Sequence, residues 1–112
     1  MAKTQTKAAV LRSSGNVFAD LGVSHAEEKQ TKVRLAVAIN RIIKERRLSQ
    51  SVAANLLRIN QPKISALVHY QLTGFSVERL MNFLNALGRD VEIVVRRKPK
   101  SRRAARILVT AA

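Results

Sequence analysis

The sequence predicts a mainly α-helical domain of four to five helices that ends in a single β-strand. Between residues 24 and 87, apolar residues recur with the spacing of helix faces, and helix-capping residues separate the runs. After Gly88 the apolar spacing changes to two in residues 91–96, which are rich in β-branched side chains. We therefore expect a disordered N-terminal arm at residues 1–16, a folded domain at 17–97 and a basic, mostly disordered tail at 98–112.

The first long helix is expected over residues 24–47. Ser24 is a suitable N-cap, and Glu27 three residues later completes a capping box. Ahead of this helix, Phe18 and Leu21 are expected to attach the preceding segment to the domain. The apolar stripe that would face the core comprises Val33, Leu35, Ala36, Ile39, Ile42 and Ile43.

Three shorter helices follow, each with its own boundary signals. One runs from Gln50 through Leu57. The next begins after Asn60, a good N-cap, with Pro62 in its first turn, where a missing N–H costs little. The last is capped by Ser76 and stopped at Gly88, and its apolar face comprises Val77, Leu80, Phe83, Leu84 and Leu87.

The charge of the chain points to a polyanionic partner. Its 112 residues include 21 Lys and Arg against 7 Asp and Glu, a formal net charge of +14. Half of this excess lies in residues 96–112, which contain no acidic residue. A balance of this kind is typical of proteins that bind nucleic acid.

The composition excludes several other functions. Cysteine is absent, so disulfides, thiolate catalysis and cysteine-ligated zinc are excluded. His25 and His69 are far apart and have no acidic cluster beside them, so we expect neither a metal nor another cofactor. The acidic residues are scattered and no nucleophile–base spacing appears, so we do not expect an enzyme. The apolar run 107–109 is too short to cross a membrane, and we expect a cytoplasmic, nucleoid-associated protein.

The segment from Gln50 to Leu67 predicts a helix-turn-helix. Two short helices joined only by residues 58–60 must cross steeply, and close crossing needs a small residue, which Ala54 supplies. The shared core would be Leu57, Ile59, Ile64 and Leu67. The outer face of the second helix then carries Gln61, Lys63, Ser65 and Ala66. An ordinary pair of packed helices in a bundle is the alternative.

The same residues resemble a known family. The pattern Leu48, Ser49, Gln50, Ala54, Leu57, Ile59, Gln61, Ile64, Ser65 and Leu67 is similar to the DNA-binding domain of the phage-repressor/Cro (XRE) family. The stretches 74–80, 83–93 and 18–22 resemble an antitoxin-like branch, similar to HigA and GraA. The resemblance covers roughly residues 16–97.

The resemblance implies a dimeric repressor of its own operon that binds double-stranded DNA at a near-palindromic operator, and often also a RelE-like RNase toxin. By position, Gln50 would contact a phosphate, and Gln61, Pro62 and Ala66 would read base edges. Gln61 is the best candidate for direct readout, because its amide can pair bidentately with adenine. The wider set of candidate DNA-binding residues adds Arg58, Asn60, Lys63, Ser65 and His69.

The sequence departs from the family pattern at two turns. Arg58 occupies the turn position where glycine is usual because that position favours positive φ, so we expect a strained turn or an extra phosphate contact. Tyr70 stands where another glycine is usual, after the second helix, and His69 where a basic residue is common. Phosphate anchoring by this loop would then require His69 or Tyr70 to donate to the DNA backbone.

The lone strand predicts a homodimer. A single strand leaves its backbone groups unpaired, and no second strand is recognisable in the chain. The simplest partner is the same strand of another copy, paired antiparallel about a two-fold axis through Val91, Ile93, Val94 and Val95. Such pairing would place two recognition helices about 34 Å apart, one turn of DNA. An edge strand docked on the chain's own helices is the alternative.

Three functions from different classes remain open at this stage. The favoured one is a sequence-specific repressor that acts as an antitoxin, with a stand-alone regulator as its alternative. The second is a toxin-binding module for which DNA binding is secondary. The third is a nonspecific nucleic-acid-binding protein that relies on its basic tail.

Overall fold

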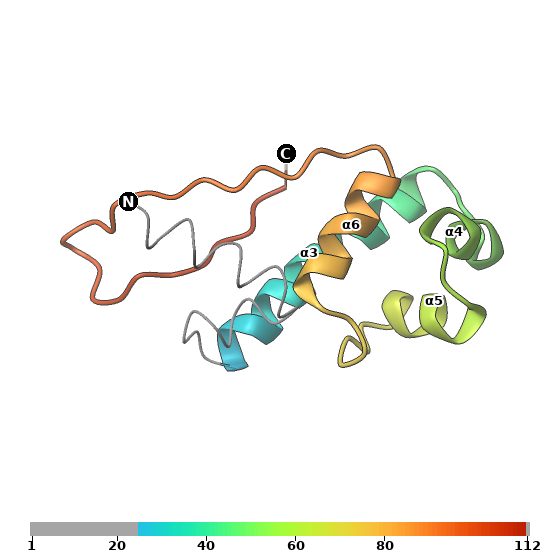
Figure 1. Cartoon of the computed structure of the whole chain (residues 1–112), viewed down its shortest axis with the longest axis horizontal. Coiled ribbons are helices and arrows are strands. Elements are labelled where there is room, and N and C mark those ends of the chain that lie inside the picture. The colour runs from blue at the N-terminus through green and yellow to red at the C-terminus, as the bar shows by residue number, and fades with distance from the viewer. Residues whose placement is uncertain (1–24, 112) are drawn as a thin grey trace, which may run out of the picture.

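The computed structural model describes residues 25–111 and shows a mainly helical fold (Figure 1). The described helices are α3 (His25–Glu45), α4 (Gln50–Leu57), α5 (Gln61–Val68) and α6 (Val77–Ala86). These bounds agree with the predicted helices to within about two residues. The predicted arm at 1–16, the attachment through Phe18 and Leu21, and the Ser24 cap lie outside the described residues.

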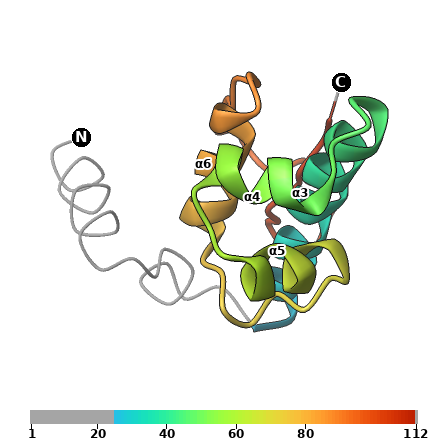
Figure 2. The same cartoon turned by 90° about the vertical axis from the view of Figure 1, so that its right-hand side faces the viewer.

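The helices form two packed pairs around one core. α3 lies along α6, while α4 packs against α5 at the other end of the body (Figures 1 and 2). α3 also contacts α5, so the core is continuous between the pairs. Its largest fully buried side chains are Ile39, Ile64, Leu67, Phe75, Leu80 and Leu87.

The predicted core of the helix pair α4–α5 is confirmed. Leu57, Ile64 and Leu67 are buried, and Ile59 is half-buried against them. Ala54 is only 6% exposed, as close helix crossing requires. The prediction for Val33 was wrong, because its side chain is 44% exposed. The buried stripe of α3 begins instead at Thr31 and continues through Leu35, which places Val33 on the opposite side of the helix.

All four described helices end in the same way, with a Schellman motif. At the end of α4, the Arg58 N–H donates to the Asn55 carbonyl (3.3 Å) and the Ile59 N–H donates to the Ala54 carbonyl (3.0 Å). The equivalent pairs of bonds close α3, α5 and α6. The residue at the left-handed position is Arg47 (φ 53°), Arg58 (φ 56°), Tyr70 (φ 61°) or Gly88 (φ 82°). The positive φ expected at Arg58 is therefore confirmed, and so is the stop at Gly88.

The C-terminal segment leaves the helical body after α6 and then returns to it (Figure 1). The chain reverses at Pro99, whose carbonyl accepts from the Arg102 N–H (3.2 Å), and Val109 packs against the core. No described residue lies in a strand, so the segment 91–96 has no ladder partner within residues 25–111. Because a strand needs a partner, the pairing of this segment with a second copy stays a prediction. The division of the chain into arm, domain and tail also stays a prediction.

Replacing Arg58 tests the backbone strain at the turn between α4 and α5. Arg58→Gly is expected to be more stable than Arg58→Ala by about 0.5–1 kcal/mol, because glycine adopts the left-handed conformation without a Cβ clash and loses part of that gain to unfolded-state entropy. Urea denaturation of both variants measures the difference. An alanine variant as stable as the glycine variant would contradict a strained turn.

Candidate nucleic-acid interface

The interface is built from the first turns of α4 and α5. Ser49 caps α4, and its hydroxyl accepts from the Val52 N–H (3.1 Å). Asn60 caps α5, as predicted from the sequence, and its Oδ1 accepts from the Lys63 N–H (2.9 Å). Pro62 lies in the first turn of α5. These caps fix where each helix begins and therefore where the side chains at its start are placed.

A side-chain hydrogen bond joins the two helix starts. The Gln61 Nε2 donates to the Gln50 Oε1 at 2.8 Å, across the surface of the molecule. One amide hydrogen of Gln61 is thereby used, while its Oε1 and its second hydrogen stay available to a ligand. Gln50 keeps its own Nε2 as a donor. The sequence predicts separate roles for these two residues and gives no signal for the bond between them, because they lie eleven residues apart.

The other candidates on α5 differ in their accessibility. Gln61 and Pro62 are exposed, whereas Ser65 and Ala66 are half-buried. Arg58 and Asn60, in the preceding turn, are also exposed. The structure thus brings Gln50 and the beginning of α5 together on one surface, and the contribution of each residue to DNA binding stays a prediction.

Lys63 lies back against the loop between α5 and α6. Its Nζ donates to the Gly74 carbonyl (3.3 Å) and stands 5.1 Å from the centroid of the Phe75 ring. The guanidinium of Arg79 lies over the same ring and over Phe83, which meets Phe75 edge to face. A phosphate contact by Lys63 would therefore require its ammonium to leave the aromatic ring.

His69 follows α5 as its C-cap and is exposed. Its Nδ1 lies 2.8 Å from the Ser65 carbonyl oxygen. Because a carbonyl can only accept, Nδ1 carries the hydrogen in this contact, and Nε2 is left for another partner. The side chain is therefore held along the end of α5.

Two more exposed groups lie beside this surface: Arg47, for which no role was predicted, and Tyr70, which was considered only as an alternative to His69 for a phosphate contact. Arg47 ends α3 three residues before Gln50, and Tyr70 follows α5 directly after His69. Both have the same left-handed backbone as Arg58. The signal that could have found them is positional, since each is the residue at which the chain turns after a helix.

Comparisons with known proteins agree with this geometry. A family model described as a helix-turn-helix domain matches residues 17–96. A solved structure named as an XRE-family transcriptional regulator is 65% identical, with a TM-score of 0.77, and the match covers 80% of this chain and all of the other. The chain belongs to the XRE family of helix-turn-helix proteins. Among curated proteins, no match was found.

Within residues 25–111, this XRE-family chain has neither a cluster of metal-binding side chains nor a membrane-spanning helix. No group of three or more histidine, cysteine, aspartate or glutamate residues is placed to hold a metal ion. None of the described helices has the length and apolar character that a membrane crossing requires.

Proposed function

We propose that this protein is a sequence-specific repressor that binds double-stranded DNA as a homodimer. The main support is the hydrogen bond between Gln50 and Gln61, which holds two amide side chains at the exposed start of α5. The net charge of +14 favours binding to the same polyanionic partner. Membership of the XRE family supports the same function. Binding at a promoter would exclude RNA polymerase. The cytoplasmic, nucleoid-associated location expected from the sequence is part of this proposal.

The glutamine pair suits recognition of adenine in the major groove. The free Oε1 of Gln61 accepts from the adenine N6 amino group, and its second amide hydrogen donates to N7. The Gln50 Oε1 holds the first hydrogen, so the amide cannot rotate without breaking this bond. The Gln50 Nε2 then donates to the nearby phosphate. Affinity would come mainly from cations on phosphates, and selectivity from the few contacts to base edges.

Gln61→Ala is expected to relax sequence selectivity by about 1–3 kcal/mol, because it removes a bidentate contact. The measurement compares a duplex from upstream of the gene with a scrambled duplex of the same length. Gln50→Ala should lower selectivity less, since the amide of Gln61 remains but is no longer held.

Ser51→Ala, at an exposed position beside Gln50, serves as the control. Equal affinity of the unaltered protein for both duplexes would contradict sequence-specific recognition. Loss of affinity without loss of selectivity in Gln61→Ala would remove Gln61 from direct readout.

The segment around Val91, Ile93, Val94 and Val95 supports the homodimer. The side chains of Ile93, Val94 and Val95 are 77%, 65% and 92% exposed, which is unfavourable for three adjacent β-branched residues in water. Antiparallel pairing with a second copy would satisfy their backbone groups and cover part of this surface. It would also relate two α5 helices by a two-fold axis, as a near-palindromic operator requires.

Ile93→Pro is expected to convert the dimer into a monomer, because proline removes a ladder N–H and blocks pairing in mid-strand. Sedimentation velocity at micromolar concentration measures the change. Ile93→Thr, which keeps a β-branched side chain and the N–H, is the matched control. A monomeric unaltered protein would contradict the proposed strand pairing.

The antitoxin role is the finer part of the proposal and is supported by the sequence resemblance to the HigA- and GraA-like branch. It predicts that a neighbouring reading frame encodes a short, basic, RelE-like RNase that copurifies with this chain and loses its toxicity in coexpression. A growth assay with and without this chain measures neutralisation. Absence of such a neighbour would leave a stand-alone regulator.

A further inference from the structure

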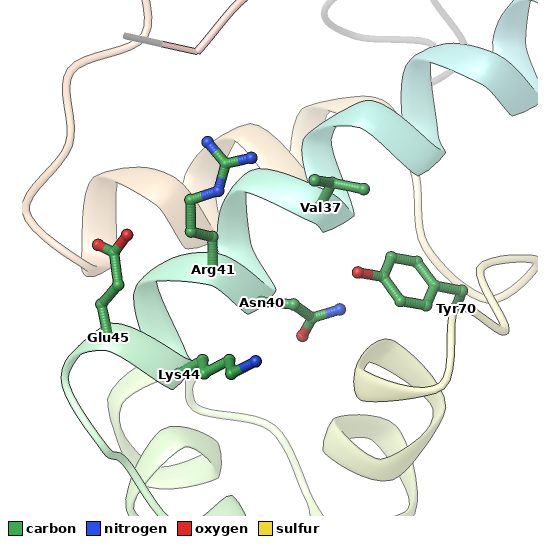
Figure 3. Close-up of a pocket in the computed structure, with 6 residues that line it drawn as sticks. All are labelled: Val37, Asn40, Arg41, Lys44, Glu45 and Tyr70. Carbon is green, nitrogen blue, oxygen red and sulfur yellow. The ribbon is translucent and has the colours of Figure 1, made fainter.

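A hollow beside the candidate interface is not used by the proposed readout. It lies between the last turns of α3 and Tyr70, two residues after the end of α5, and its volume is about 380 Å³. Its lining residues are Val37, Asn40, Arg41, Lys44, Glu45 and Tyr70. In Figure 3 the Lys44 ammonium, the Asn40 amide and the Tyr70 hydroxyl point into the same space, while the Glu45 carboxylate lies at the far end.

Asn40 organises the floor of this hollow. Its Nδ2 donates to the Leu67 carbonyl (3.1 Å), which ties α3 to the last turn of α5 and fixes the orientation of the amide. Its Oδ1 is buried and has no hydrogen-bond partner in the structure. A buried acceptor without a donor is costly, so this oxygen indicates an incomplete site. Lys44 is one helical turn further along the same face, within reach of this oxygen.

Tyr70 is held at the edge of the hollow at an energetic cost. Its φ of 61° lies in the left-handed region, which a bulky aromatic residue rarely adopts. The side chain is nevertheless 45% exposed, so burial does not explain why tyrosine occupies this position. Strained residues of this kind cluster at binding sites, where the backbone conformation aims a side chain.

The position of the hollow relative to Gln61 suits the DNA backbone. The eight residues of α5 separate Gln61 from the hollow by about 12 Å along the helix axis. The major groove is also about 12 Å wide. With α5 lying across the groove and its start on the base edges, the hollow would stand at the rim of the groove, where phosphates line the duplex.

We propose that this hollow seats a DNA phosphate beside the base pairs that Gln61 reads, an inference that rests on the proposed function. A phosphate offers only acceptors and negative charge, and the Lys44 ammonium and the Tyr70 hydroxyl supply donors. One ammonium hydrogen satisfies the Asn40 Oδ1, and the other two are directed at the phosphate. Arg41 adds positive charge at the rim, and Glu45 opposes it.

Lys44→Gln tests the charge of the seat. Loss of the Lys44 charge should weaken binding to promoter and scrambled duplexes alike. It should also reduce the slope of log K against log salt by about 0.9 between 50 and 200 mM salt. Lys29→Gln, at an exposed position near the other end of α3, makes the same charge change and should leave the slope nearly unaltered. Glu45→Gln should act in the opposite direction and tighten binding to both duplexes.

Tyr70 allows a test in which stability and binding change in opposite directions. Tyr70→Gly relieves the left-handed strain, so the melting temperature should rise, while affinity for both duplexes should fall. A residue with only a structural role would shift neither affinity nor the salt slope when the fold becomes more stable. Tyr70→Phe keeps the ring and the backbone, and loss of the hydroxyl should lower affinity about tenfold.

The outcomes separate this inference from the proposed function. If the unaltered protein fails to discriminate promoter from scrambled DNA, the proposed function is wrong. If it discriminates, but Lys44→Gln and Tyr70→Phe behave like Lys29→Gln, only the phosphate seat is wrong. Uniform loss of affinity with intact discrimination in both variants would support it.

Discussion

The arrangement of this domain depends on how each helix is terminated. Two hydrogen bonds close every described helix, and both require a left-handed residue at the point of reversal. Without the reversal at Arg58, α4 and α5 could not cross within three linking residues, and the Gln50–Gln61 bond could not form. Three of these four positions carry a side chain with a Cβ, at a cost of about 1–2 kcal/mol each. The core must offset this cost.

The residues that adopt a left-handed backbone despite having a Cβ lie in the turns that border the candidate interface. Arg47 precedes α4, Arg58 separates α4 from α5, and Tyr70 follows α5, whereas Gly88 ends α6, a helix that contributes no residue to the candidate interface. The strained turns are thus those that can present a cation or a hydroxyl to a nucleic acid. Glycine remains where the chain only has to reverse. We infer that the chemistry of the side chain, rather than the low conformational energy of glycine in the left-handed region, determines the residue at these three turns.

Local chemistry made much of the fold predictable. Asn60, Ser76 and Gly88 act within one turn of their own position, so their roles can be read without knowledge of the tertiary structure. Ala54 was predictable because only a small side chain permits two short helices to cross closely. Val33 was misassigned because its spacing from Ala36 fits a helical stripe, although its side chain lies on the opposite side of α3 from the stripe that packs against α6. The position of Lys63 depends on Phe75, twelve residues away, and the Gln50–Gln61 bond depends on how two helices meet.

The exposed side chains at Ile93, Val94 and Val95 have a consequence for the handling of this protein. An extended segment of β-branched residues with unpaired backbone groups can pair with any similar segment, whether that segment belongs to a native or a misfolded chain. A newly synthesised chain at low concentration would expose this apolar segment until a second chain pairs with it. With the proposed strand pairing as the native state, the yield of folded protein on refolding should be highest at an intermediate protein concentration, because chains stay unpaired below it and aggregate above it.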